Sequence, residues 1–269
     1  MPFAKAQSVI KKMLPERDYG SLYNSACKVY DVYQSIKDNI FYRIPSTDAE
    51  VRQMKKILRA IKSHTMTSRV GLLATYAIAV QSRIDNLQGA FVECGVARGG
   101  CAAMMALVAG GSRKTWLFDS YEGLPEQSDK DGQQKPVRGN DRTANDLAKG
   151  YCLGTFEDVE HLLYTKLQLN RGRVLMVRGW FDDTLPVWRD NVGDIAVLRL
   201  DCDWYESTMC CLKNLYDSVV EGGWVIIDDY QLPGCKKAVN DFLQDRKQKL
   251  FTIFDANGRA YINKQGVAT

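Results

Sequence analysis

The sequence has few of the residues on which many catalytic mechanisms depend. Its 269 residues include two histidines, His64 and His161, which limits any mechanism that needs a histidine base. None of its eight cysteines forms a C-x-x-C pair, and this argues against a zinc site. We interpret the cysteines as reduced, intracellular thiols, because several lie in apolar stretches where a thiol behaves as a small hydrophobe.

Long apolar runs and a strong net charge are also missing. No uninterrupted apolar segment is long enough to span a bilayer. The first residues, MPFAKAQSVIKKMLPERD, contain lysines where a signal peptide would have its apolar centre. The net charge of +4 is too mild to indicate a nucleic-acid or membrane partner. We expect a cytoplasmic protein that acts on a small molecule, and the sequence is compatible with a homo-oligomer.

Strands and helices alternate along most of the chain, as is typical of a parallel sheet with helices on both faces. Two late segments can pair as a hairpin around Gly258 and add an antiparallel edge. The prediction is an α/β fold with a mostly parallel, seven-stranded sheet. The expected strands are residues 90–94, 115–118, 173–177, 195–200, 224–227, 251–254 and 259–263.

Two regions differ from this pattern. Residues 1–63 precede the alternation and are predicted to form an N-terminal helical extension or lid, which leaves residues 64–269 as the main domain. The stretch from Pro125 to about Gly154 is long and rich in polar residues and glycine. Such an insertion predicts a mobile lid or substrate loop, with a plain surface loop as the alternative.

Aspartates come directly after two of the predicted strands. Asp201 ends the run LRLD, and Asp228 and Asp229 end the run WVIIDD. The carboxyl ends of neighbouring parallel strands face one crevice, where the three carboxylates would repel each other unless a cation joined them. Oxygen ligands of this kind suit Mg²⁺. The alternative is that these aspartates cap the helices next in the chain.

Three charged residues close to Asp201 have more than one interpretation. Arg199 lies inside an otherwise apolar strand, where it could pair with a carboxylate on a sheet face or at a subunit contact. Asp203 and Glu206 come soon after Asp201 and could either support the metal site or lie on the surface.

A glycine-rich turn comes after the first strand, in the sequence ECGVARGG that begins at Glu93. Its glycines let the backbone approach a ligand, although a plain tight turn would need them too. The spacing is not G-x-G-x-x-G, which argues against a dinucleotide. Asp119, at the end of the second strand, could accept hydrogen bonds from ribose hydroxyls. S-adenosylmethionine fits this pattern, because it has a ribose and an adenine but no phosphate.

Aromatic residues supply a further candidate contact with the adenine. Trp180 and Phe181 come after Gly179, just beyond the third strand, and could cover an adenine face. The alternative is that both aromatic side chains belong to the core.

Five motifs, ECGVARGG, LFDSYEGLP, GWFDDTLP, VLRLDCDWYEST and GGWVIIDDY, resemble the macrocin O-methyltransferase family over roughly residues 64–242. The resemblance implies a class I methyltransferase (Rossmann-like) fold and a Mg²⁺-dependent enzyme that methylates sugar hydroxyls of natural products. It implies Asp201, Asp228 and Asp229 as metal ligands, with Asp201 as the base. It also implies that residues 64–67 cover the methionine end of S-adenosylmethionine. The expected cofactor contacts are Thr65, Met66, Glu93, Cys94, Gly95, Gly99, Asp119, Ser120, Gly123, Gly179, Trp180, Phe181 and Asp201.

Two other functions and one other base are alternatives to this interpretation. A nicotinamide-dependent oxidoreductase is disfavoured by the missing G-x-G-x-x-G and by the Asp228–Asp229 pair. A non-catalytic S-adenosylmethionine-binding module is disfavoured because all three metal-type aspartates are present. His64 is the alternative base, since imidazole titrates near neutral pH.

Overall fold

The computed structural model describes residues 48–132, 149–246, 251–255 and 257–264. The chain divides into two compact units, one of residues 1–52 and 133–147 and one of residues 53–132 and 148–269. The second unit holds the whole sheet. Most of the predicted N-terminal extension and much of the predicted polar insertion fall outside the described residues, so the domain boundary at residue 63 stays a prediction.

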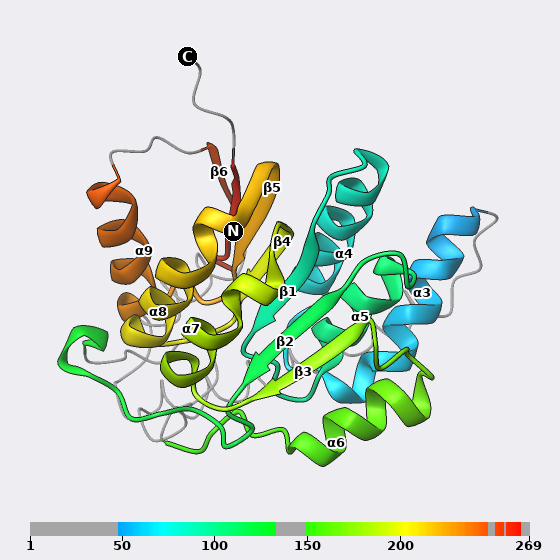
Figure 1. Cartoon of the computed structure of the whole chain (residues 1–269), viewed down its shortest axis with the longest axis horizontal. Coiled ribbons are helices and arrows are strands. Elements are labelled where there is room, and N and C mark those ends of the chain that lie inside the picture. Colours follow the sequence, from blue (N-terminus) through cyan, green and yellow to red (C-terminus); the bar gives the residue numbers. More distant parts are fainter. Residues whose placement is uncertain (1–47, 133–148, 247–250, 256, 265–269) are drawn as a thin grey trace, which may run out of the picture. The chain divides into compact units, whose positions relative to one another are not determined.

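The sheet has seven strands in the order β3-β2-β1-β4-β5-β7-β6 (Figure 1). The first five strands in this order are parallel to one another, and β7 and β6 extend the sheet in antiparallel pairs. This confirms the predicted mostly parallel, seven-stranded sheet. The strands are β1 (Ala90–Cys94), β2 (Thr115–Asp119), β3 (Val174–Arg178), β4 (Ile195–Leu200), β5 (Val219–Ile227), β6 (Phe251–Phe254) and β7 (Ala260–Asn263).

One strand is longer than its pattern predicts. β5 begins at Val219 rather than at Trp224. Gly222 and Gly223 interrupt the apolar run there, and the pairing of β5 with β4 shifts register over the same stretch. Glycine inside a strand pattern is typical of such an irregularity, so the periodicity hides the first half of the strand.

Helices cover both faces of the sheet, with α4 and α5 on one face and α7, α8 and α9 on the other (Figure 1). The pattern did not predict α7, because Pro186 lies inside it and much of its surface is polar. A short α6 and the π-helical turn next to it were also missed. The helices are α3 (Ala49–Ile61), α4 (Arg69–Ile84), α5 (Gly100–Ala109), α6 (Phe156–Glu160), α7 (Phe181–Val192), α8 (Tyr205–Leu215) and α9 (Pro233–Asp245).

The central strands β1 and β4 are buried along their whole length. Near-continuous burial is expected of parallel strands that have helices on both faces. The charged residues of these strands, Glu93 and Arg199, are therefore buried together with their apolar neighbours. None of the helices in the described ranges is long and apolar enough to cross a membrane.

The beginning of the polar insertion is anchored to the N-terminus of α8. The indole Nε1 of Trp204 donates to the carbonyl of Pro125 at 3.2 Å. The buried carboxylate of Asp131 accepts from the backbone N–H of Tyr205 at 2.7 Å and from Ser128. Asp131 therefore caps α8 from a distant part of the chain, which is a role that local sequence patterns do not reveal.

Candidate active site

The candidate site residues gather at the carboxyl edge of the central strands. Strand pairing places Cys94 beside Phe118 on one side and beside Leu200 on the other. Leu200 in turn lies beside Ile227, so the carboxyl ends of β2, β1, β4 and β5 lie in a row along this edge. The strand order reverses between β1 and β4, and ligands of open α/β sheets bind at this kind of switch point.

The glycine turn and the end of β4 are in direct contact. Gly95 has a φ of 87°, a conformation that residues with a side chain rarely adopt. A Cβ built on Gly95 would overlap the backbone carbonyl of Asp201. The N–H of Asp201 also donates to the carbonyl of Cys94 at 2.9 Å. Only glycine at position 95 lets the turn lie against the strand that carries Asp201.

Asp119 holds the glycine turn in place. Its Oδ2 accepts from the N–H groups of Val96 at 2.6 Å and Ala97 at 3.0 Å, and its Oδ1 accepts from the N–H of Tyr121 at 2.6 Å. Burial raises the pKa of Asp119, and these three amides oppose the rise. The sequence predicted a ribose contact, which stays a prediction, and the structure adds a role in shaping the turn.

We therefore expect Asp119→Ala to weaken cofactor binding and also to destabilise the fold. The substitution leaves three backbone N–H groups without their acceptor, at a cost of about 1–3 kcal/mol for each one that stays buried and unsatisfied. Calorimetric titration with S-adenosylhomocysteine and thermal melting measure the two effects. An unchanged dissociation constant would refute the ribose contact, and an unchanged melting temperature would refute the turn-holding role.

The segment after β2 closes on itself beside Asp119. The hydroxyl of Ser120 accepts from the N–H of Glu122 at 3.1 Å and lies 3.3 Å from the carbonyl of Gly123. Gly123 has a φ of 81°, and a Cβ there would meet the carbonyls of Gly150 and Tyr151. Ser120 and Gly123 thus shape this loop, and their contacts with a cofactor stay predictions.

The remaining expected cofactor contacts occupy three places. Trp180 and Phe181 begin α7 and are both half-buried, so neither is a core residue. Met66 is exposed in the loop before α4, where the hydroxyl of Thr65 accepts from the N–H of Thr67 at 3.1 Å. Gly99 precedes α5 with a φ of 82°, and Gly179 donates its N–H to the carbonyl of Asp119.

Three carboxylates form a compact group at the ends of β4 and β5. Asp201, Asp203 and Asp229 each offer an oxygen, and these oxygens lie within 4.8 Å of one another. The N–H of Asp203 donates to Oδ2 of Asp229 at 3.3 Å. Asp203 has a φ of 55°, a left-handed conformation that aspartate tolerates better than most residues. The backbone thus turns Asp203 back toward the end of β5.

The electrostatics of this group suit a cation. Burial, together with the charges of Asp201 and Asp228, raises the pKa of Asp203 well above its usual range. Burial and the charges of Asp203 and Asp201 do the same to the pKa of Asp229. Like charges gathered in a site of low polarity disfavour ionisation, and a divalent cation with a preference for oxygen ligands would relieve that repulsion. The residues present therefore fit Mg²⁺.

Asp228 has a different environment from the one that the sequence predicted. Its Oδ1 accepts from Arg199 and from Arg259, both at 2.8 Å. Burial and the charge of Asp201 raise the pKa of Asp228, whereas the two guanidinium groups lower it. Of the three predicted ligands, Asp201 and Asp229 belong to the compact group, and Asp203 takes the third place there. The metal role of Asp228 stays a prediction.

Arg199 lies at the centre of a buried network. Its side chain has no exposed surface. Nη1 donates to Oε1 of Glu93 at 2.7 Å and to Oδ2 of Asp201 at 2.8 Å, and Nη2 donates to Asp228 and to the hydroxyl of Thr67 at 3.1 Å. Burial raises the pKa of Glu93 to about 8, against the attraction of Arg199. Glu93 is buried against Arg199, and its expected contact with a cofactor stays a prediction.

His64, the alternative base, has other neighbours. Its Nε2 lies 3.1 Å from Nζ of Lys166. Burial and the charge of Lys166 lower the pKa of His64. No contact between His64 and the three grouped carboxylates is present among the described residues, so its role as a base stays a prediction without geometric support.

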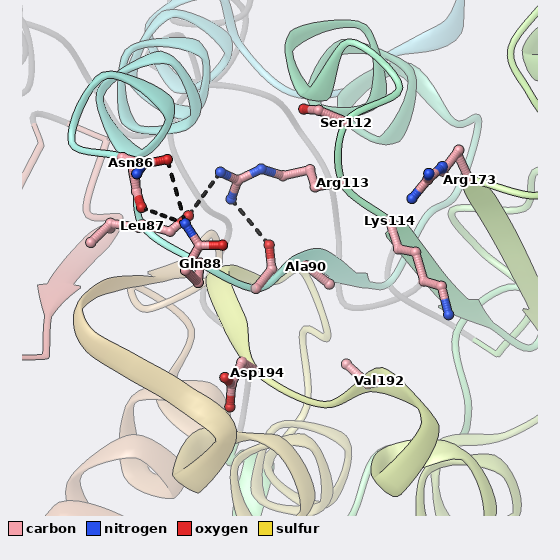
Figure 2. Close-up of a pocket in the computed structure, with 11 residues that line it drawn as sticks. Asn86, Leu87, Gln88, Ala90, Ser112, Arg113, Lys114, Arg173, Val192 and Asp194 are labelled. Atoms are coloured by element: carbon pink, nitrogen blue, oxygen red, sulfur yellow. Dashed lines mark hydrogen bonds between the residues drawn. The ribbon is translucent and has the colours of Figure 1, made fainter.

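A hollow of about 470 Å³ lies at the opposite edge of the sheet, near the amino ends of the strands (Figure 2). Arg113 lines it, but its guanidinium donates to the backbone carbonyls of Gly89 and Leu87. Lys114, Arg173 and Asp194 also line it, so both signs of charge are present. None of the predicted site residues lies there, and we place the active site at the carboxyl edge.

Four residues of the site were missed or left open by sequence reasoning. It left Arg199 and Asp203 undecided, although an arginine inside an apolar strand was a usable signal. Thr67 was expected only as part of the loop over the cofactor, and Arg259 only as the start of a strand. Each of these two reaches the site from a segment far away in the chain, and no periodicity or motif links those segments to β4.

Comparison with known proteins identifies the family to which the chain is similar. Residues 14–260 match the model of a family described as macrocin-O-methyltransferase (TylF). The 8-demethyl-8-(2,3-dimethoxy-alpha-L-rhamnosyl)-tetracenomycin-C 4'-O-methyltransferase of Streptomyces olivaceus is 33% identical over 229 residues, covering 79% of this chain and 83% of that protein. The mycinamicin III 3''-O-methyltransferase of Micromonospora griseorubida is 29% identical and covers 67% and 70%. The structure of the O-methyltransferase NovP has a TM-score of 0.63 at 30% identity and covers 76% and 83%.

Proposed function

Because this chain belongs to the macrocin O-methyltransferase family, we propose that it transfers a methyl group from S-adenosylmethionine to a sugar hydroxyl of a small glycosylated natural product, with Mg²⁺. Membership of the family makes the chain an O-methyltransferase. The acceptor class is proposed from the relatives, one of which is named for a rhamnosyl group on tetracenomycin. The alternative of a nicotinamide-dependent oxidoreductase is excluded, because this family consists of methyltransferases.

The main support for the proposal is the cluster of three carboxylates beside the glycine turn. Asp201, Asp203 and Asp229 offer oxygens within 4.8 Å of one another, and Gly95 lies against the backbone of Asp201. A cofactor at the turn and a cation at the carboxylates would therefore be neighbours. We propose Asp201, Asp203 and Asp229 as the metal-binding set, and we keep the predicted ligand Asp228 as a residue to be tested.

The reaction needs a nucleophile held in line with the methyl group. A cation bound by the carboxylates of Asp201, Asp203 and Asp229 would lower the pKa of the acceptor hydroxyl and fix the position of its oxygen. The acceptor oxygen bonds to the methyl carbon as the carbon–sulfur bond breaks, which leaves a methyl ether and S-adenosylhomocysteine. Asp201 accepts the hydroxyl proton in this proposal. The turn at Gly95, shaped by Asp119, would hold the methyl donor next to Asp201 and so would contribute to catalysis through proximity.

The proposal is tested by the uptake of labelled methyl groups into glycosylated natural products in the presence of Mg²⁺. Thermal melting separates the alternatives, because S-adenosylhomocysteine should stabilise a methyltransferase and NAD should not. A protein that NAD stabilises and S-adenosylhomocysteine does not would refute the proposal.

Removal of divalent cations should abolish turnover. We expect excess EDTA to stop methyl transfer to a working acceptor and Mg²⁺ to restore it, because the carboxylates cannot acidify the hydroxyl by themselves. The measurement is the initial rate before and after chelation. Full activity in EDTA would remove the metal from the mechanism.

Two variants with matched substitutions, compared by how strongly they bind Mg²⁺, identify the carboxylates that hold the metal. Asp203→Asn should weaken Mg²⁺ binding if the compact group is the site. Asp228→Asn should weaken it if the set predicted from the sequence is right. Both substitutions remove one carboxylate charge and keep the shape of the side chain, so a difference between them identifies the ligand. Melting curves control for the loss of the Asp228 contacts with Arg199 and Arg259.

An aromatic pair offers a surface for the acceptor. Tyr230 is the next residue after Asp229, and its ring centroid lies 5.2 Å from that of Phe254. Phe254 pairs with Ala260, which pairs with Ile227, so it belongs to the same edge of the sheet as Asp228. Phe254 is 55% exposed. We propose that this pair packs against the apolar face of the acceptor.

Phe254→Ala should therefore raise the KM for the acceptor and leave kcat within about threefold. The loss of part of a stacking surface is worth roughly 0.5–1.5 kcal/mol, which corresponds to about a 2- to 13-fold change. Steady-state kinetics with varied acceptor measure the effect. Val187→Ala is the matched control, because Val187 is an exposed apolar residue on α7. An equal response of both variants would refute the assignment.

A further inference from the structure

We propose that Arg199 is a positioning residue that couples cofactor binding to metal binding. Its guanidinium binds Thr67, in the loop expected to cover the methionine end of the cofactor. It also binds the carboxylates of Asp201 and Asp228. The inference rests on the proposed function, since it assumes that S-adenosylmethionine and Mg²⁺ occupy this crevice. Arg199 itself would touch neither the cofactor nor the metal, but it binds side chains on the cofactor side and on the metal side.

The geometry of Arg199 carries the inference. Four side chains accept from its two terminal nitrogens at 2.7–3.1 Å: Glu93, Asp201, Asp228 and Thr67. The guanidinium is completely buried, so water does not replace a partner that moves away. It is also planar, and its donors keep fixed directions. A displacement of one partner therefore disturbs the bonds to the others.

Thr67 is the connection to the cofactor side. Its hydroxyl accepts from Nη2 of Arg199 and also lies 3.5 Å from the thiol of Cys101, which donates to it. Its backbone N–H donates to the hydroxyl of Thr65, a residue expected to contact the cofactor. A ligand that orders this loop thus fixes the position of the Thr67 hydroxyl against Arg199.

Asp201 is the connection to the metal side. Its Oδ2 accepts from Nη1 of Arg199, and it also supplies an oxygen to the group formed with Asp203 and Asp229. Cofactor binding that fixes the guanidinium would orient Asp201 before a cation arrives. Since linkage is reciprocal, a bound cation would prepare the loop for the cofactor to the same extent.

A simpler role for Arg199 would be to neutralise buried carboxylates. That role predicts that its substitution lowers stability, without any effect on the ratio of Mg²⁺ affinities measured with and without cofactor. The coupling ratio is therefore the informative readout, and stability is not.

The experiment titrates Mg²⁺ into the unmodified chain by calorimetry, with and without saturating S-adenosylhomocysteine. We expect S-adenosylhomocysteine to tighten Mg²⁺ binding at least about fivefold in the unmodified protein. Thr67→Val keeps the size of the side chain and the charge of the site but removes the hydroxyl that Arg199 contacts. In this variant the ratio should fall to about twofold or less. Thr75→Val is the matched control, because Thr75 is a buried threonine of α4 outside the network, and it should keep the full ratio.

Arg199→Lys provides a second variant, since lysine keeps the charge but cannot bond four partners at once. Its coupling ratio should also fall, in protein that circular dichroism shows to be folded. The inference would be overturned if Thr67→Val kept the same ratio of Mg²⁺ affinities, with and without S-adenosylhomocysteine, as the unmodified protein. It would also be overturned if the unmodified protein showed no coupling. Failure of the unmodified protein to bind S-adenosylhomocysteine would overturn the proposed function together with it.

Discussion

Asp201→Asn should remove turnover while leaving the affinity for S-adenosylhomocysteine, measured without Mg²⁺, nearly unchanged. Asparagine keeps the shape of the side chain, but it is a poorer metal ligand and cannot accept the proton of the acceptor hydroxyl. The loss should exceed the 10²–10⁴-fold that is typical when a general base alone is removed, because a metal contact is lost as well. The cofactor should still bind, since the turn at Gly95 and its anchor Asp119 are intact.

Single-turnover rates at saturating Mg²⁺, together with calorimetry for the cofactor, measure the two halves of this prediction. Asp217→Asn is the matched control, because Asp217 pairs with Arg246 outside the crevice and should leave turnover unchanged. If Asp201→Asn kept more than about a tenth of normal turnover, well short of the typical loss, the base would lie elsewhere. Asp203 would then be the next residue to test, because it shares the carboxylate group, whereas His64 contacts Lys166.

Arg199→Met should destabilise the protein severely. Methionine fills much of the same volume but leaves Glu93 and Asp228 in the interior with one cationic partner fewer. Breaking a buried ion pair by the removal of one partner costs about 3–5 kcal/mol. For a domain of this size that loss lowers the melting temperature by roughly 6–20 °C. Arg189→Met is the control, because its ion pair with Asp190 is exposed and such pairs contribute about 0–1 kcal/mol.

The destabilisation should depend on pH with a definite sign. Burial raises the pKa of Glu93 to about 8, above its value of 4.5 in the unfolded chain. A group with a raised folded-state pKa contributes stability below its unfolded pKa and loses it as the pH rises through the folded one. Arg199 opposes this rise, so its removal raises the pKa of Glu93 further, and the destabilisation relative to the unmodified protein should be smallest at pH 5 and grow as the pH rises through 8 and above. Melting curves across this range that showed the opposite trend would contradict the assignment of Glu93 as the uncompensated group.

Local patterns in the sequence determined the fold, because most strands and helices have an apolar run or a periodicity of their own. The run IAVLRL and the run AFVEC predicted two buried central strands, and both have the predicted bounds. The pattern failed where a residue disfavours the structure that it belongs to. Pro186 hid α7, and Gly222 and Gly223 hid the start of β5, since in both places tertiary packing outweighs the local preference.

The sequence by itself also determined that the candidate site residues share one edge, because carboxylates that come directly after parallel strands must lie at the same edge of the sheet. It placed Asp201, Asp228 and Asp229 there, together with the glycine turn. Only the tertiary structure decided which carboxylates meet. The left-handed backbone of Asp203 turns its side chain toward Asp229, and Arg199 and Arg259 draw Asp228 into an ionic network. These contacts join residues from distant parts of the chain at distances of about 3 Å, and a spacing along the sequence cannot encode them.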